Sequence, residues 1–119
     1  MDILIVVGRV MFGAYFSMMG VMHFKNAKML NEYAASKGVP MPSVAVMVTG
    51  LVLLIGGLGV VLNLNTQNAL LLIALFLLVI TPQMHAFWKE TDPAKKMTEK
   101  QTFLKNMALL GAALAMLAL

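Results

Sequence analysis

The chain has 119 residues, of which 61% are hydrophobic and 12% are charged, and it contains no cysteine. A soluble domain is nearer half apolar and a quarter charged, so this composition indicates an integral membrane protein in one domain, residues 1–119. The lack of cysteine excludes disulfides, thiolate metal sites and iron–sulfur clusters. The formal net charge of +4 does not indicate nucleic-acid binding, because the lysines lie in loops beside hydrophobic runs, where they set membrane topology.

The first predicted membrane span covers residues 3–24, which is long enough for a hydrocarbon core of about 30 Å. It lacks a basic leader and a small-residue cleavage pattern, so we interpret it as a retained span and not as a signal peptide. Arg9 lies inside the span, where a charge costs roughly 2.5 kcal/mol or more. Either Arg9 reaches the nearby membrane surface, with Asp2 as a partner, or it has a buried functional role. Arg9, Phe16 and His23 share one helical face, which we expect to face the interior of a bundle.

The next stretch leaves the membrane core and contains a predicted amphipathic helix, residues 27–37, which Asn26 caps and Gly38 ends. Its apolar stripe is expected to lie in the membrane interface, with the polar side chains turned away. The second span, residues 44–62, has no charge and four glycines, which let neighbouring helices approach closely. In the amphipathic helix 27–37, the apolar stripe comprises Met29, Leu30, Tyr33 and Ala34. The side chains of this helix that are predicted to face away are Lys28, Asn31, Glu32, Ser36 and Lys37.

The third span, residues 68–88, ends in a group of polar and aromatic residues. Pro82 lies one turn from its end and can kink the helix, and His85 and Trp88 follow. This exit is the most polar and kinked setting beside any of the predicted spans.

The last part of the chain contains two helix-start signals. Asp92 and Pro93 predict a short helical turn, and Thr98 with its following residues predicts a capping box for a fourth span, residues 100–119. The predicted fold is therefore an all-α membrane protein with four transmembrane helices in a bundle and a short interfacial amphipathic helix between the first and second.

The distribution of lysines predicts the orientation. The loop after the first span and the region after the third span carry the lysines, whereas the middle loop and both ends of the chain carry none. The positive-inside rule places the two long loops in the cytoplasm and both termini outside it.

Two histidines, His23 and His85, are expected at similar depth on the cytoplasmic side and are the main candidates for chemistry. Such a pair could ligate haem or a metal ion, or relay protons to a quinone, whereas interfacial histidines also commonly bind a loop or a lipid headgroup. Haem is disfavoured because both histidines lie at helix ends without propionate-binding arginines, and no metal-ligand spacing is present, so no metal site is predicted. Lys105 is expected to reach the surface, and Asn106 to hydrogen-bond across helices.

Over its whole length the chain resembles the DoxX family of small bacterial four-span membrane proteins. The resemblance implies a four-helix bundle in the bacterial inner membrane, similar to the large subunit of a thiosulfate:quinone oxidoreductase or to membrane partners of thiol and superoxide defence enzymes. Many members place a glutamate where this chain has Leu53, and that glutamate would be the natural partner of the intramembrane arginine. The residues that carry the resemblance are Gly8-Arg9, Phe12-Gly13, His23-Phe24, Gly38-Val39-Pro40, Gly50, Gly56-Gly57, His85 to Trp88 and Lys105 to Gly111, and Arg9, His85, Lys105 and Asn106 match the family's polar pattern.

Three hypotheses for function follow. The first is a redox-associated subunit that holds a quinone, with His85 bonded to a carbonyl oxygen and Arg9 or Lys105 supplying positive charge. Electrons would come from a partner protein, and any enzyme activity would be that of a quinone-dependent oxidoreductase subunit. The second is a non-catalytic membrane scaffold or adaptor that docks a soluble partner through its basic loops. The third is a small-molecule carrier, suggested by a weak repeat between the exits of the first and third spans. Under each hypothesis the expected partners are the lipid bilayer and either a protein partner or a second copy of the chain.

Overall fold

The long apolar runs of the sequence form long α-helices. A computed structural model describes residues 2–119, and over this range the chain is helical with no β-strand. The prediction of an all-α protein is therefore confirmed. The helices are α1 (Ile3–Lys25), α2 (Ala27–Ser36), α3 (Pro42–Leu62), α4 (Thr66–Met84) and α5 (Pro93–Leu117), with a short 3₁₀ turn, η1 (Phe87–Lys89), between the last two.

Local signals explain where the helices begin and end. The Asp2 carboxylate accepts a hydrogen bond from the Leu4 backbone N–H (2.9 Å) and caps α1. Gly38, at φ +78°, ends α2 as predicted, because a left-handed residue lets the next N–H, that of Val39, bond back to the Ala34 carbonyl (3.1 Å).

The start of α5 corrects the predicted boundary. Asp92 accepts from the Lys95 N–H (3.1 Å), and Pro93 occupies the first turn, so the whole of α5 begins here and not at residues 98–101. Thr98 lies inside the helix, where its hydroxyl donates to the Ala94 carbonyl (3.1 Å). The predicted capping box is wrong because the stronger Asp-Pro signal starts the helix six residues earlier.

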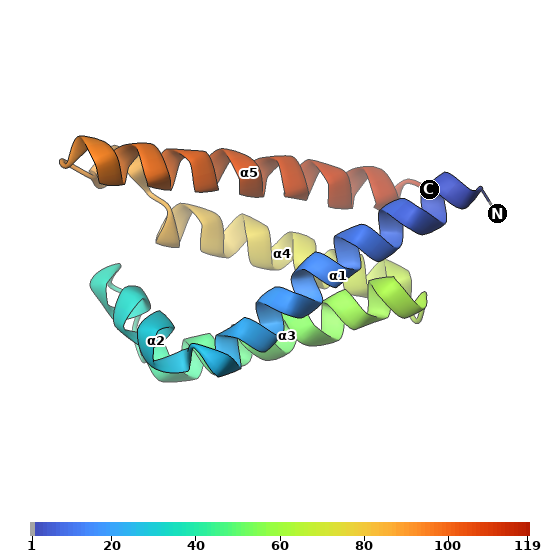
Figure 1. Cartoon of the computed structure of the whole chain (residues 1–119), viewed down its shortest axis with the longest axis horizontal. Helices are drawn as coiled ribbons and strands as arrows, with labels where there is room; N and C mark the ends of the chain where they lie inside the picture. Colours follow the sequence, from blue (N-terminus) through green and yellow to red (C-terminus); the bar gives the residue numbers. More distant parts are fainter. Residues whose placement is uncertain (1) are drawn as a thin grey trace.

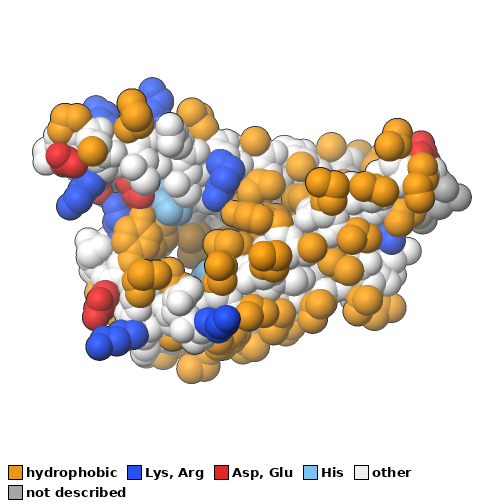
Figure 2. All heavy atoms as spheres, viewed as in Figure 1, with side chains coloured by type: hydrophobic (Ala, Val, Ile, Leu, Met, Phe, Trp, Pro, Cys, Tyr) orange, Lys and Arg blue, Asp and Glu red, His pale blue; other side chains and the backbone are white. Residues whose placement is uncertain are grey.

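The helices form two hairpins that pack side by side. α1 packs mainly on α3, α5 runs along α4, and contacts between α3 and α4 join the two pairs. Figure 1 shows both termini at one end of the molecule, together with the turn between α3 and α4. The opposite end holds α2, η1 and the start of α5, and we call it the lysine-rich end because most Lys side chains gather there (Figure 2).

Glycines allow α1 and α3 to approach closely, as the sequence predicts. A Cβ added at Gly57 would lie 2.5 Å from the Ser17 backbone nitrogen and 2.8 Å from the Gly13 carbonyl oxygen. A Cβ at Gly50 would lie 2.8 Å from the Cβ of His23, so this glycine lets His23 lie directly against α3. The α1–α3 contact therefore depends on residues without side chains.

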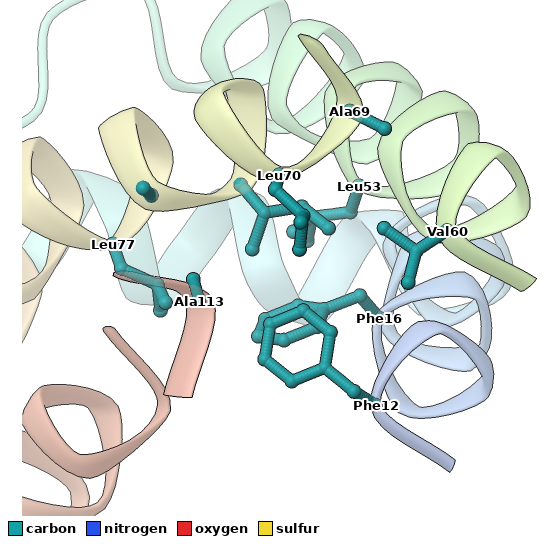
Figure 3. Close-up of a cluster of buried hydrophobic side chains, with 10 residues drawn as sticks. Phe12, Phe16, Leu53, Val60, Ala69, Leu70, Leu77 and Ala113 are labelled. Atoms are coloured by element: carbon teal, nitrogen blue, oxygen red, sulfur yellow. The ribbon is translucent and has the colours of Figure 1, made fainter. Parts of the chain in front are cut away.

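The core lies where α3 and α4 meet α1 and α5. Leu53, Val60 and Ile73 are fully buried there, and the Phe12 and Phe16 rings lie tilted against each other with centroids 4.9 Å apart. Figure 3 shows Phe12, Phe16, Leu53 and Val60 together with Leu70 and Leu77 of α4 and Ala113 of α5. Large apolar side chains also cover the outside of the helices, as expected for a surface that faces acyl chains (Figure 2).

Three segments are long and apolar enough to cross a membrane: Ile3–Lys25, Pro42–Leu62 and Thr66–Lys89. They contain the first three predicted spans. α5 covers residues 100–117 of the predicted fourth span, 100–119, but is not one of these three segments. Polar residues occupy its middle, and the apolar residues 107–117 rise only about 17 Å. The four-span bundle and the interfacial position of α2 stay predictions.

Candidate functional site

A cavity of ≈270 Å³ lies between the two hairpins, toward the lysine-rich end, and all five α-helices contribute to its lining. Figure 2 shows this face hollowed, with histidine side chains bordering the recess. The walls are mainly apolar. The polar groups come from α1, α2 and α5, and from His85, which directly follows α4. The apolar lining consists of Phe16, Met19, Leu30, Leu53, Phe76, Leu77, Ile80 and Met84, and the polar lining of Tyr15, His23, Tyr33, His85, Thr102, Lys105 and Asn106.

Both predicted histidines line this cavity. His23 lies in the last turn of α1, and its Nδ1 is 2.7 Å from the Met19 carbonyl oxygen. Because a carbonyl only accepts, Nδ1 carries a hydrogen and donates it to this oxygen. His85 follows the last residue of α4, which contains Pro82, and its backbone N–H donates to the Thr81 carbonyl (2.9 Å).

A buried carboxylate, Glu99 of α5, holds the lysine-rich end of the site together. The Tyr33 hydroxyl lies 2.7 and 2.9 Å from its two oxygens and donates to the carboxylate. Lys37 Nζ lies 2.9 Å from Oε2, and His85 Nδ1 lies 3.4 Å from the same oxygen. Glu99 is only 7% exposed. Its carboxylate joins α5 to three other parts of the chain: α2, the segment after α2 and the end of α4.

The sequence pattern alone did not find this cluster. The pattern predicts a capping box at Glu99, an apolar interfacial stripe for Tyr33 and an outward face for Lys37. The structure corrects the position of Lys37, which is mostly buried and also pairs with Glu90 (2.8 Å). The start signal at Asp92 and Pro93 could have found it, because a helix that begins there places Glu99 about two turns after the N-cap, where an acidic residue does not serve as a cap.

The three partners change one another's acidity. Burial raises the pKa of Glu99, but hydrogen bonds from Lys37 and Tyr33 outweigh burial and leave this pKa below its ordinary value. Burial and the hydrogen bond to Glu99 raise the pKa of Tyr33, so the phenol stays protonated and can donate. Burial lowers the pKa of Lys37, yet its bonds to Glu90 and Glu99 leave it raised, so Lys37 stays charged.

The predicted polar pair of α5 also lies at the cavity. Asn106 Nδ2 donates to the Thr81 hydroxyl (3.3 Å), which is fully buried, and this confirms a hydrogen bond between helices. Lys105 is exposed, as predicted, but its Nζ also donates to the Tyr15 hydroxyl (3.0 Å) and lies 5.6 Å from the centroid of that ring. Lys105 and Tyr15 therefore link α5 to α1 across the mouth of the cavity.

Arg9 is not part of this site. It lines a separate hollow of ≈240 Å³ near the termini, together with Asn63 and Thr66. Leu53, in contrast, lines the cavity that contains the histidines, and it precedes Asn63 by about 15 Å along α3. Leu53 and Arg9 therefore line different hollows, and the pairing of a glutamate at position 53 with Arg9 stays a prediction.

The cavity is small for a ligand site. Its volume is just below the range typical of drug-sized ligands. Across residues 2–119 the structure shows no group of three or more His, Asp or Glu side chains that could hold a metal.

A protein-family model, DoxX, matches residues 4–86, which is more than half of the chain. The matched range covers α1 to the end of α4 and includes both histidines, while α5 with Glu99, Lys105 and Asn106 follows it. Neither curated proteins nor solved structures show a significant match to the chain.

Proposed function

Because the chain belongs to the DoxX family of membrane proteins, we propose that its cavity binds the ring of a quinone and that the chain serves as the membrane subunit of a redox system. The observation that supports this proposal most directly is the combination of apolar walls and convergent polar groups in one cavity. A bound quinone would supply the electron-accepting chemistry, and a partner protein would supply the electrons. The chain itself binds the ring, orients it and positions charge beside it.

The lining residues suggest how a ring would be held. Phe16 and Phe76 provide apolar and aromatic surface for its faces, and His85 can hydrogen-bond one carbonyl oxygen. Lys105 supplies positive charge at the cavity mouth, which would favour negative charge on a ring oxygen. Arg9 is left out of this role because it lines the other hollow.

We further propose that residues 1–119 form one domain in a bacterial inner membrane, with α5 as a fourth span against α4. The position of the loops supports an orientation with both termini outside the cytoplasm. The lysine-bearing segments after α1 and after α4 lie at the same end of the molecule, where the positive-inside rule would place the cytoplasm (Figure 2).

A scaffold function is the second candidate, and the exposed lysines of α5 support it. Lys95 and Lys96 are exposed in the first turns of α5, and Lys95 borders a polar hollow of ≈560 Å³. A soluble acidic partner could dock there without any ligand in the cavity. Charge reversal at both lysines should abolish recovery of such a partner, and unchanged recovery would contradict the scaffold function.

Fluorescence of the single tryptophan provides a test of quinone binding. Trp88 lies three residues after His85, and a quinone ring in the cavity should quench it. Purified protein in mild detergent would be titrated with a short-tailed quinone, and the organic extract of the untreated protein would be analysed by mass spectrometry. We expect saturable quenching, weakened about fivefold by His85→Ala through loss of one hydrogen bond worth about 1 kcal/mol.

Gln83→Ala is the matched control, because Gln83 is exposed and does not line the cavity. It should bind quinone as the unchanged protein does. Equal affinity of the His85→Ala variant would show that the proposed site is wrong. Purely linear quenching together with an extract free of quinone would contradict quinone binding altogether and favour the scaffold function.

A further inference from the structure

Two hollows lie on opposite sides of one cluster of side chains. The cavity between the hairpins lies on one side, and the polar hollow of ≈560 Å³ at the lysine-rich end lies on the other. Tyr33 lines both, whereas His85 lines only the cavity and Glu99 only the polar hollow. The Glu99 carboxylate and the His85 ring therefore meet within the partition between the two spaces.

The distance between these two groups fits proton exchange. Glu99 Oε2 and His85 Nδ1 are 3.4 Å apart, slightly longer than a good hydrogen bond, so a small movement would join them. Nδ1 is buried and has no hydrogen bond among the described residues 2–119. The carboxylate is the nearest group that can give this nitrogen a proton or take one from it.

The surrounding charges keep the carboxylate in place. Tyr33 and Lys37 both bond to Glu99, and Lys37 also bonds to Glu90, which faces the polar hollow. On the cavity side, Lys105 is the charged group that lines the cavity with His85. Glu99 is thus fixed by donors, and the oxygen that accepts from Lys37, Oε2, is also the one that lies 3.4 Å from the imidazole.

We propose that Glu99 and His85 form a proton path between the water of the polar hollow and a ligand in the cavity. Glu99 takes a proton from a water molecule, which leaves hydroxide in the polar hollow, and the new O–H bond breaks as an N–H bond forms at Nδ1. The ring then releases the proton of Nε2 to an oxygen of the ligand. The charge of the imidazole is unchanged at the end and its hydrogen has moved from Nε2 to Nδ1; the reverse sequence carries a proton outward and restores the first tautomer. The identity of the ligand, a ring that gains or loses protons with its electrons, rests on the proposed function, whereas the path itself rests on the geometry.

The path can be tested without any ligand, on the full chain labelled with ¹⁵N-histidine in detergent micelles. Nuclear magnetic resonance would measure how fast the imidazole N–H protons exchange with water. His23 lines the same cavity but bonds a backbone carbonyl and has no carboxylate partner within residues 2–119, so it serves as the internal reference. In the unchanged protein, His85 should exchange at least about tenfold faster than His23, in keeping with the usual effect of a positioned acid–base group; an equal or slower rate would overturn the proposal.

Two variants separate a proton path from a merely structural contact. Glu99→Gln keeps the shape but cannot carry a proton, and it should slow His85 exchange at least about tenfold. Glu90→Gln removes the other carboxylate bonded to Lys37 and should leave the rate unchanged. The proposal is wrong if Glu99→Gln leaves exchange unchanged or faster, or if Glu90→Gln slows it as much.

Quinone titration of the same samples separates the two proposals. If quinone quenches Trp88 but Glu99→Gln leaves exchange unchanged, the proton path fails while the quinone site stands. If quinone does not bind and Glu99→Gln slows exchange, the proposed ligand fails while the path stands.

Discussion

The close contact between α1 and α3 predicts a large difference between two identical substitutions. An alanine at Gly57 would place its Cβ 2.5 Å from the Ser17 backbone nitrogen and 2.5 Å from its Oγ. Neither atom can move easily, because the first belongs to the α1 backbone and the second donates to the Gly13 carbonyl (2.9 Å). The helices would have to separate, which costs about 1–3 kcal/mol.

Gly111→Ala is the matched control, since Gly111 also lies inside a helix but has no atom within 4 Å of an added Cβ. Alanine favours a helix over glycine by about 1 kcal/mol at both positions, so this contribution cancels in the comparison. Gly57→Ala should therefore be less stable than Gly111→Ala by about 1–3 kcal/mol when both are unfolded with sodium dodecyl sulfate and followed by circular dichroism. Equal stability of the two variants would refute the close packing of α1 on α3.

Two further predictions concern the cavity and its charged end. The pKa of Glu99 is lowered in the folded protein, so the ionised carboxylate stabilises the fold above the ordinary pKa near 4.5, and this stabilisation should be lost as the pH falls below that value. The free energy of unfolding should therefore be lower at pH 3.5 than at pH 7. Glu99→Gln should reduce this difference. Leu53→Glu should destabilise the chain by at least about 2 kcal/mol relative to Leu53→Met, because it buries a charge. Since position 53 and Arg9 line different hollows, the coupling energy between Leu53→Glu and Arg9→Met should stay below about 0.5 kcal/mol in a double-mutant cycle, and a larger value would place the two together.

The sequence predicts the helices well because their signals are local. Apolar runs of membrane length, Gly38 and Asp92 each act within a few residues, and the glycines of α3 foretell close packing with a neighbour. The shared depth of His23 and His85 also follows from topology, since each ends a helix that runs toward the same end of the molecule. These features need no knowledge of which helix packs against which.

The cluster around Glu99 could not be predicted in the same way. Glu99 lies inside α5 because that helix begins at Pro93, whereas the competing start signal at Thr98 predicts an unrelated role for the same residue. Lys37 follows a polar helix face, and only the position of α5 across from α2 turns it toward two carboxylates. A contact between residues 66 positions apart leaves no mark in local periodicity.

The site itself follows from how the two hairpins meet. Glycines draw α1 against α3, and α5 stays on α4, so between the pairs the space near the lysine-rich end is not filled by backbone. Polar links then cross that space at two places, Lys105 with Tyr15 at the mouth and Glu99 with Tyr33 at the end. A cavity bounded by separable side-chain contacts can admit a ligand without moving the α1–α3 or α4–α5 packing, whereas a site inside either hairpin would require the close helix contact to break.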